Sequence, residues 1–339
     1  MAQIRSNSQS STGKSEIMRA GFIGTGYFAN EHAECLRRLG VEVAACFGTN
    51  QLKTEEFSNK FGALRFNSPL DMIDKKNIDV LFIVVPPFAH DGEVELAAIE
   101  KGIPFLGEKP IGLDLSKCRD IASRIEQKGL VTSSGYWLRA GNVSERIKRV
   151  MSANQIALAQ SFRLSGFIRA PWWGNMETSG GPLVEMVTHY IDYMRFMLGE
   201  IQSVTALSKR GVNSSRPNCD VYDSIVSLLL FSNGQIGSLN SSHILQDDVA
   251  SKRILELTGR EFYMCVETER VKYKQGAENW MALDFESNRM DINTQRFLEA
   301  VRRDDPAFVY GSYPDALKTL EVTMAISKSA EEKGCGWLT

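Results

Sequence analysis

Residues 19–40 read RAGFIGTGYFANEHAECLRRLG and join a short apolar run to a pattern of apolar residues at helical spacing. We therefore expect a strand followed by a helix. Between them, Gly24, Gly26 and Ala29 form the pattern G-x-G-x-x-A. In dinucleotide-binding turns the first glycine permits the tight turn, the second admits a pyrophosphate, and the small third residue lets the helix pack closely on the strand. The same pattern also fits a purely structural turn, so the rest of the chain has to decide between the two.

Strand and helix signals keep alternating after this turn. The run IDVLFIVV at residues 78–85 is apolar without alternation, which is typical of a strand covered on both faces. Such regular alternation predicts a doubly wound parallel sheet, in which the glycine-rich turn binds a dinucleotide. Further strands are expected at residues 41–47, 103–109 and 130–137, with helices ending near residue 60 and covering 94–102 and 116–129.

The pattern changes beyond Gly141. Strands are predicted at 203–210, 223–231, 236–245 and 252–259, and helices at 143–151, 189–198, 293–301 and 314–333. Asn233-Gly234 is a strong hairpin signal, while Ser312 and Gly334 are placed to cap and end the last helix. We predict an α/β protein with an N-terminal Rossmann domain at 18–140 and an α+β domain at 141–339, the latter with a largely antiparallel open sheet.

Composition narrows the range of partners. The 339 residues suit two domains, and 39 basic against 41 acidic residues leave no net field for nucleic acid or a membrane surface. No apolar stretch approaches the roughly 18 residues of a membrane helix. Six scattered cysteines predict a reduced, cytoplasmic protein. Residues 1–17 are rich in Ser, Gln and Asn, and we expect them to be disordered or a tag remnant, with a transit peptide as the alternative.

Three motifs stand in order along the chain: VVPPFAH at residues 84–90, EKP at 108–110, and SGGPLVEMVTHYIDYMRFMLGE at 179–200. Together they resemble the glucose-fructose oxidoreductase / inositol dehydrogenase / MocA family of oxidoreductases. The resemblance implies that Lys109 and His189 are catalytic and that Asp192, one turn later, lies at the substrate. Glu185 falls where many members have an aspartate that works with the histidine. The resemblance implies the same role for Glu185, although its side chain is one methylene longer than that of aspartate.

The turn, the loop after the second strand and the two later strand ends make up the predicted dinucleotide site. Its residues are Gly24, Thr25, Gly26, Tyr27, Phe28, Ala29, Gly48, Thr49, Asn50, Pro86, Pro87, His90, Glu108 and Lys109. NAD-binding proteins usually carry an acid about twenty residues after the turn, on the adenosine ribose. Here the sequence reads AACFGTNQLK without an acid, and Lys53 offers a counter-charge. We therefore expect either NADP or NAD, with NADP favoured.

The chemistry of alcohol oxidation fits these residues. A base near the nicotinamide must take the hydroxyl proton as hydride leaves, and histidine titrates in the right range. Lys109 at a strand end would stabilise alkoxide character. Glu185 and His189 are four apart, so a regular helix would place them on one face. Without the three motifs, Lys109 would be interpreted as an exposed residue in a turn and His189 as a core residue. The motifs favour a catalytic role for both.

The remaining site residues concern the substrate. Trp172 and Trp173 could stack on the C–H faces of a sugar or plug a loop, and Arg163 or Arg169 could pair with an acidic group. Glu185 and His189 lack a third ligand at recognisable spacing, so we expect no metal.

We therefore predict an NAD(P)-dependent dehydrogenase or reductase acting on a sugar, cyclitol or sugar-like secondary alcohol, assembled as a homodimer or homotetramer. Two alternatives stay open at this point. One is a non-catalytic regulatory protein that senses a dinucleotide on the same fold. The other is a glycosidase-like enzyme that keeps its NAD tightly bound.

Overall fold

The computed structural model describes residues 17–74, 78–246, 249 and 251–332. The expectations for residues 1–16 and for a helix end at Gly334 lie outside these ranges. No helix within them is both long and apolar enough to cross a membrane.

The first sheet is parallel throughout and has the strand order β3-β2-β1-β4-β5-β6, as a doubly wound fold requires. Its strands are β1 Arg19–Ile23, β2 Glu42–Phe47, β3 Leu64–Arg65, β4 Val80–Ile83, β5 Phe105–Gly107 and β6 Thr132–Ser134. The helices between them are α1 Tyr27–Arg38, α2 Gln51–Phe61, α3 Pro69–Asp74, α4 Glu93–Lys101 and α5 Leu115–Lys128. The predicted Rossmann fold is confirmed. The sequence analysis missed β3 and α3 because each is too short to show a period.

The second sheet has the order β14-β13-β12-β11-β7-β10-β9-β8 and is antiparallel except where β7 runs beside β10. Its strands are β7 Ile156–Gly166, β8 Ile201–Lys209, β9 Ser224–Phe231, β10 Ile236–Leu245, β11 Lys252–Gly259, β12 Phe262–Val266, β13 Arg270–Gln275 and β14 Met281–Asp284. The predicted open, largely antiparallel sheet is confirmed, as is the hairpin at Asn233-Gly234 between β9 and β10.

The sequence analysis overlooked β7, the strand near the middle of this sheet. Its inward positions include Ser161, Arg163 and Ser165, which are all buried. Polar side chains on the inner face erase the apolar alternation by which a strand is recognised. β7 is thus a strand that carries polar groups inward. The strands β12, β13 and β14 were not predicted either.

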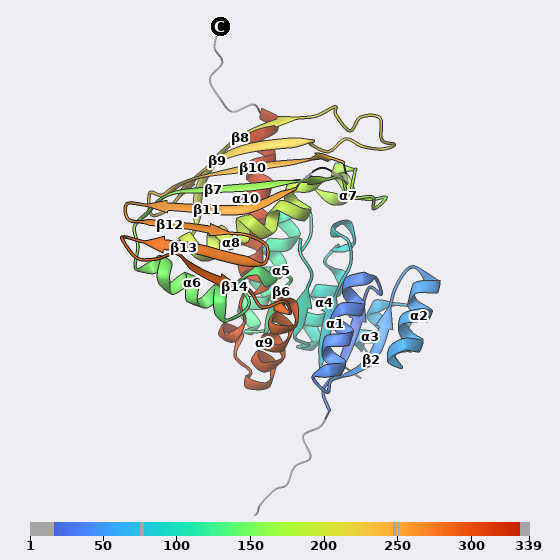
Figure 1. The fold of residues 1–339 in the computed structure, drawn as a ribbon. Coiled ribbons are helices and arrows are strands. Elements are labelled where there is room, and N and C mark those ends of the chain that lie inside the picture. Colours follow the sequence, from blue (N-terminus) through green and yellow to red (C-terminus); the bar gives the residue numbers. More distant parts are fainter. Residues whose placement is uncertain (1–16, 75–77, 247–248, 250, 333–339) are drawn as a thin grey trace, which may run out of the picture.

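Helices cover one face of the second sheet (Figure 1). A large apolar core lies between that face and α6 Asn142–Ser152, α8 Thr188–Leu198 and α10 Tyr313–Glu332. Ser312 accepts from the backbone at the start of α10, as expected of its cap.

The last two helices also contact the first domain. In the helix α9, Arg289–Arg303, Phe297 and Leu298 pack into the same core as Ala29 and Ala33 of α1. The proposed division at residue 140 thus separates the two sheets, whereas α9 returns to the N-terminal unit. The carboxyl ends of the parallel strands consequently face residues from the second sheet.

Candidate active site

The glycine-rich turn leaves an open helix end. Gly24 has φ +96°, and a Cβ there would lie 2.0 Å from the backbone oxygen of Val84, so the turn itself requires glycine. A Cβ on Gly26 would meet nothing within 4 Å, and Gly26 caps α1 without a side-chain hydrogen bond. Tyr27 and Phe28 behind it are exposed. The first amides of α1 therefore stand open to an anion, which fits the pyrophosphate of a dinucleotide.

The loop after β2 carries no carboxylate between Phe47 and Asn50. Asn50 Oδ1 accepts from the Lys53 amide at 3.1 Å, so this side chain caps α2. Gly48 packs against Thr25 and Thr54, because its Cβ would lie 2.7 and 2.5 Å from their hydroxyl oxygens. Thr49, between Gly48 and Asn50, is exposed.

Behind the turn, two predicted residues make buried pairs. His90 Nδ1 lies 2.8 Å from Glu95 Oε1, next to the short helix η1 Pro87–Ala89. Glu108 Oε1 lies 3.1 Å from His32 Nε2, whose other ring nitrogen contacts Thr294 of α9. Glu108 thus ties the end of β5 to α1 and α9 while still lining the main cavity.

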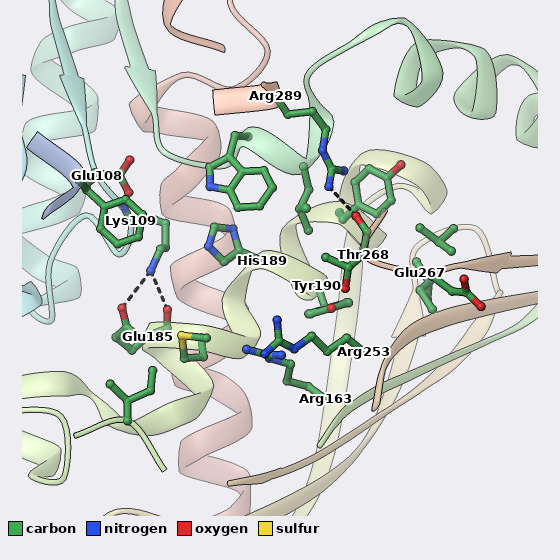
Figure 2. Close-up of a pocket in the computed structure, with 18 of the residues that line it drawn as sticks. Glu108, Lys109, Arg163, Glu185, His189, Tyr190, Arg253, Glu267, Thr268 and Arg289 are labelled. Carbon is green, nitrogen blue, oxygen red and sulfur yellow. Dashed lines mark hydrogen bonds and ion pairs between the residues drawn. The ribbon is translucent and has the colours of Figure 1, made fainter. Parts of the chain in front are cut away.

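Lys109 is held by Glu185 (Figure 2). Its Nζ donates to Glu185 Oε1 and to the Glu185 backbone oxygen, both at 2.9 Å. The second carboxylate oxygen of Glu185 accepts from the Trp173 indole N–H at 3.2 Å. Both charged side chains are nearly buried, so their mutual orientation is well defined.

The expected pairing of Glu185 with His189 is wrong. No hydrogen bond joins them among the described residues, because residues Leu183–Val187 form a π-helical turn, η3, before α8 begins. A π-turn is wider than an α-turn, so residues four apart no longer lie one above the other. The carboxylate instead turns toward Lys109.

His189 lies on the cavity wall between aromatic rings. The ring centroids of Tyr136 and Trp137 are 5.8 and 5.5 Å away. Its Nδ1 is buried and has no hydrogen-bond partner in the described part of the chain. Burial, followed by the positive charges of Lys109, Arg163 and Arg289, holds the pKa of His189 well below 6.5. The imidazole is therefore neutral at pH 7 and able to accept a proton.

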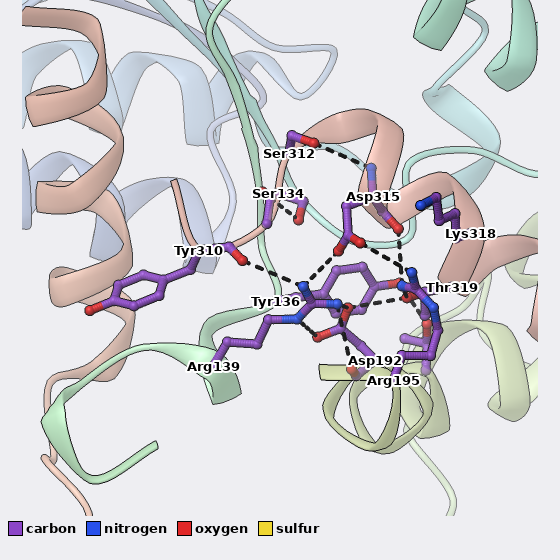
Figure 3. A network of polar contacts seen from close by, with 12 residues as sticks. Ser134, Tyr136, Arg139, Asp192, Arg195, Tyr310, Ser312, Asp315, Lys318 and Thr319 are labelled. Atoms are coloured by element: carbon purple, nitrogen blue, oxygen red, sulfur yellow. Dashed lines mark hydrogen bonds and ion pairs between the residues drawn. The ribbon is translucent and has the colours of Figure 1, made fainter. Parts of the chain in front are cut away.

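Asp192 does not contact this cavity, which corrects its predicted role at the substrate. Its side chain is fully buried and accepts from Arg139 Nε at 2.7 Å and Nη2 at 2.5 Å (Figure 3). Thr319 of α10 donates to the same carboxylate at 3.1 Å. The buried guanidinium needs this partner, and the acid therefore points away from His189.

The cavity enclosed by both domains has a volume of about 420 Å³. Trp172 and Trp173 line it as predicted, whereas Arg169 is exposed and lies outside its wall. Several lining residues were not predicted from the sequence. Trp137, Arg253 and Arg289 come from distant elements without a motif, whereas Tyr190 directly follows His189.

The described residues contain no group of three or more His, Cys, Asp or Glu side chains placed to hold a metal ion. The groups that remain for chemistry are a paired lysine, a neutral histidine and several guanidinium groups around an aromatic cavity.

The sequence and the fold of this chain are similar to those of several dehydrogenases. The chain is 23% identical over 331 residues to scyllo-inositol 2-dehydrogenase (NAD(+)) of Bacillus subtilis, covering 92% of this chain and 94% of the relative. It is 24% identical to myo-inositol 2-dehydrogenase of Thermotoga maritima, over 66% of this chain and 68% of that one. The fold matches levoglucosan dehydrogenase in complex with NADH and levoglucosan, with a TM-score of 0.84 at 18% identity over 94% and 98% of the two chains.

Two family models cover most of the chain. Residues 18–136 match the model of an oxidoreductase family with an NAD-binding Rossmann fold, and residues 153–261 match the GFO/IDH/MocA C-terminal domain. These matches fall on the two sheets described above and on the motifs around Lys109. The chain therefore belongs to the GFO/IDH/MocA family of oxidoreductases.

Proposed function

We propose that this protein is an NAD(P)-dependent dehydrogenase that transfers hydride between a nicotinamide coenzyme and a secondary alcohol or ketone of a sugar, cyclitol or similar metabolite. One observation supports it above the others. Lys109 and His189, from different domains, line one cavity at the carboxyl edge of the parallel sheet, beside the open end of α1. Relatives named as inositol dehydrogenases act on cyclitols, which agrees with the proposal.

The chain's own residues handle the proton and the developing charge. When bound, the coenzyme supplies the hydride acceptor or donor. His189, kept neutral by its surroundings, accepts the hydroxyl proton during oxidation and returns it during reduction. The Lys109 ammonium stabilises the alkoxide character of the same oxygen. Glu185 and Trp173 position that ammonium through the bonds described above.

Single substitutions test this assignment. Lys109→Met should lower turnover by about 10²–10³, the value of one positioned donor. His189→Ala should remove general base catalysis, on the order of 10²–10⁴. Turnover would be measured on a panel of polyols and sugars, and coenzyme affinity by calorimetry, with exposed Lys117→Met as the control. Coenzyme affinity should stay unchanged. Near-full turnover in both variants would refute the assignment, and coenzyme binding without any substrate would favour a regulatory role.

We also propose that NADP is accepted at least as well as NAD. The names of similar proteins give both coenzymes: one relative is an NAD(+) enzyme, one matched structure is a complex with NADH, and the name of another matched structure gives NADPH. This chain has no acid in the loop after β2. Thr49→Asp should penalise NADP through repulsion of its 2′-phosphate, whereas the neutral Thr49→Asn should not. Gly48 is a poorer test site because a Cβ there would clash with Thr54. A strong preference of the unaltered protein for NAD would contradict this proposal.

We propose the cytoplasm as the compartment. The five cysteines in the described ranges are free thiols, and a reducing environment maintains that state. Localisation of a tagged full-length protein by fluorescence microscopy tests this, and a secreted or organellar signal would contradict it.

A further inference from the structure

Two arginines face each other on the floor of the cavity. Arg163 of β7 and Arg253 of β11 are direct partners in the antiparallel register, and both side chains line the cavity. Figure 2 shows both guanidinium groups directed into the cavity on the side below His189. Two adjacent strands thus deliver two positive charges to one spot.

Neither arginine forms an ion pair with a carboxylate in the described part of the chain. Arg163 is 5% exposed, and its buried Nη1 makes no hydrogen bond. The acids that share the cavity are engaged elsewhere, as the following contacts show: Glu185 with Lys109, Glu108 with His32, and Glu267 with Lys272.

This arrangement is costly in the unliganded protein. Like charges directly opposite on neighbouring strands repel, and a buried guanidinium without a partner loses its hydration. Burial and the charge of Arg253 lower the pKa of Arg163 accordingly. Arg289 adds a third positive charge to the wall, with its guanidinium carbon 5.2 Å from the Trp137 ring centroid. An anion bound at the floor would relieve both the repulsion between Arg163 and Arg253 and the lost hydration of Arg163.

We propose that the substrate carries a carboxylate or phosphate group and that Arg163 and Arg253 bind it, while its reacting hydroxyl reaches Lys109 and His189. The proposal rests on the proposed dehydrogenase function and adds the class of substrate. Guanidinium groups bind such oxyanions through parallel hydrogen bonds, a geometry that neutral hydroxyls do not match. A neutral polyol would offset little of the free energy that is lost by burying Arg163 Nη1 without a hydrogen bond.

The test compares matched neutral and anionic probes. Glucose, glucuronate and glucose 6-phosphate form one series, and galactose, galacturonate and galactose 6-phosphate a second. Turnover with NAD and NADP is measured alongside binding to the NADH and NADPH complexes by calorimetry. We expect kcat/KM or affinity for one anionic class to exceed that for the neutral sugar by about 10- to 100-fold, the scale of charge-assisted hydrogen bonds. The carboxylate and phosphate arms identify which oxyanion the site accepts.

Variants assign the preference to this pair. Arg253→Gln, at the exposed end of the pair, should abolish the preference for the anionic probe over its neutral counterpart, because one of the two guanidinium groups is removed. Arg163→Gln should act in the same direction, and Arg253→Lys should restore part of the preference. Lys252→Gln is the matched control, since it removes a positive charge from the next residue, whose ammonium lies over the Phe162 ring.

The outcomes separate this inference from the proposed function. Turnover of neutral and anionic probes at equal efficiency overturns the anion site and leaves the dehydrogenase intact. Anion binding that Arg253→Gln removes, without turnover of any probe, supports the anion site and counts against the dehydrogenase. Absence of anion binding in the unaltered protein, or a preference unchanged in both arginine variants, overturns the inference.

Discussion

At the scale of single residues, the decisive contact is that between Lys109 and Glu185. It uses both the carboxylate and the backbone oxygen of Glu185, so the acid fixes the ammonium from two sides. Trp173 in turn fixes the carboxylate. The acid of the family motif therefore bonds to Lys109 and not to His189, and we expect its role to be the positioning of Lys109.

Glu185→Gln should consequently lower kcat without moving the pH dependence of His189. The amide keeps an acceptor for Nζ but loses the charge, and a charge-assisted bond of about 1.5–3 kcal/mol converts to roughly 10- to 100-fold. Steady-state kinetics across pH would measure both effects, with Glu267→Gln on the cavity rim as the control. A large shift of the acidic limb in Glu185→Gln would instead mean that the carboxylate acts on the imidazole.

The pH profile follows from the neutral state of His189. Protonated imidazole cannot accept the hydroxyl proton, so oxidation slows as pH falls through the pKa of His189. Because that pKa lies well below 6.5, we expect the acidic limb of kcat/KM below pH 6.5. Arg163→Gln removes one of the charges that depress the pKa, so the limb should move up toward 6.5. A limb at or above pH 6.5 in the unaltered protein would contradict this account.

At the scale of elements, a buried ionic network joins α8, α10 and the short helix η2, Trp137–Arg139. Arg139 binds Asp192 and also lies 2.6 Å from Asp315 of α10, while Arg195 contacts Asp315 and Glu200 (Figure 3). None of these network residues lines the cavity around His189. The network holds in place the helix that carries the histidine.

Asp192→Asn should therefore act on stability rather than on chemistry. Removing one partner of a buried ion pair costs about 3–5 kcal/mol, because the remaining charge is left poorly compensated. Chemical denaturation should show this loss, whereas turnover at low temperature should be largely retained. Glu200→Gln, at the half-exposed end of the network, should cost only about 0–1 kcal/mol. Unchanged stability together with lost turnover would return Asp192 to the substrate.

At the scale of the whole molecule, the face of the second sheet that helices leave open carries an apolar patch on β8, β9 and β10. Its exposed apolar side chains include Leu207, Val226, Leu228, Leu230 and Ile236. A contiguous apolar patch of this kind is typical of a protein interface. We expect it to be the contact of a homodimer or homotetramer.

Leu228→Asp should then yield a folded monomer. Leu228 is 62% exposed at the centre of this patch, so the charge costs little within one chain and is unfavourable only when a second copy covers it. Light scattering over a range of concentrations measures the mass, and circular dichroism checks the fold. Leu52→Asp, on the exposed surface of α2, is the control. A monomeric unaltered protein at all concentrations would refute the expectation.

Much of this architecture could be predicted from local sequence. The order of strands and helices around G-x-G-x-x-A specifies a doubly wound sheet, because backbone conformation and burial period are local properties. The motifs at residues 84–90 and 108–110 placed Lys109 at a strand end for the same reason. The polar inner face of β7 concealed this strand, which brings Arg163 to the cavity.

Tertiary structure decided the contacts between side chains far apart in the chain. Spacing predicted that Glu185 would face His189, but a π-turn and the approach of Lys109 redirected it. Likewise, Asp192 turned toward Arg139, and Arg253 and Arg289 reached the cavity from elements that carry no motif. The sequence determines which groups exist and which local conformations carry them. Their partners depend on packing between elements, because a buried charge is stable only beside an opposite charge or a hydrogen-bond partner, which can come from any part of the chain.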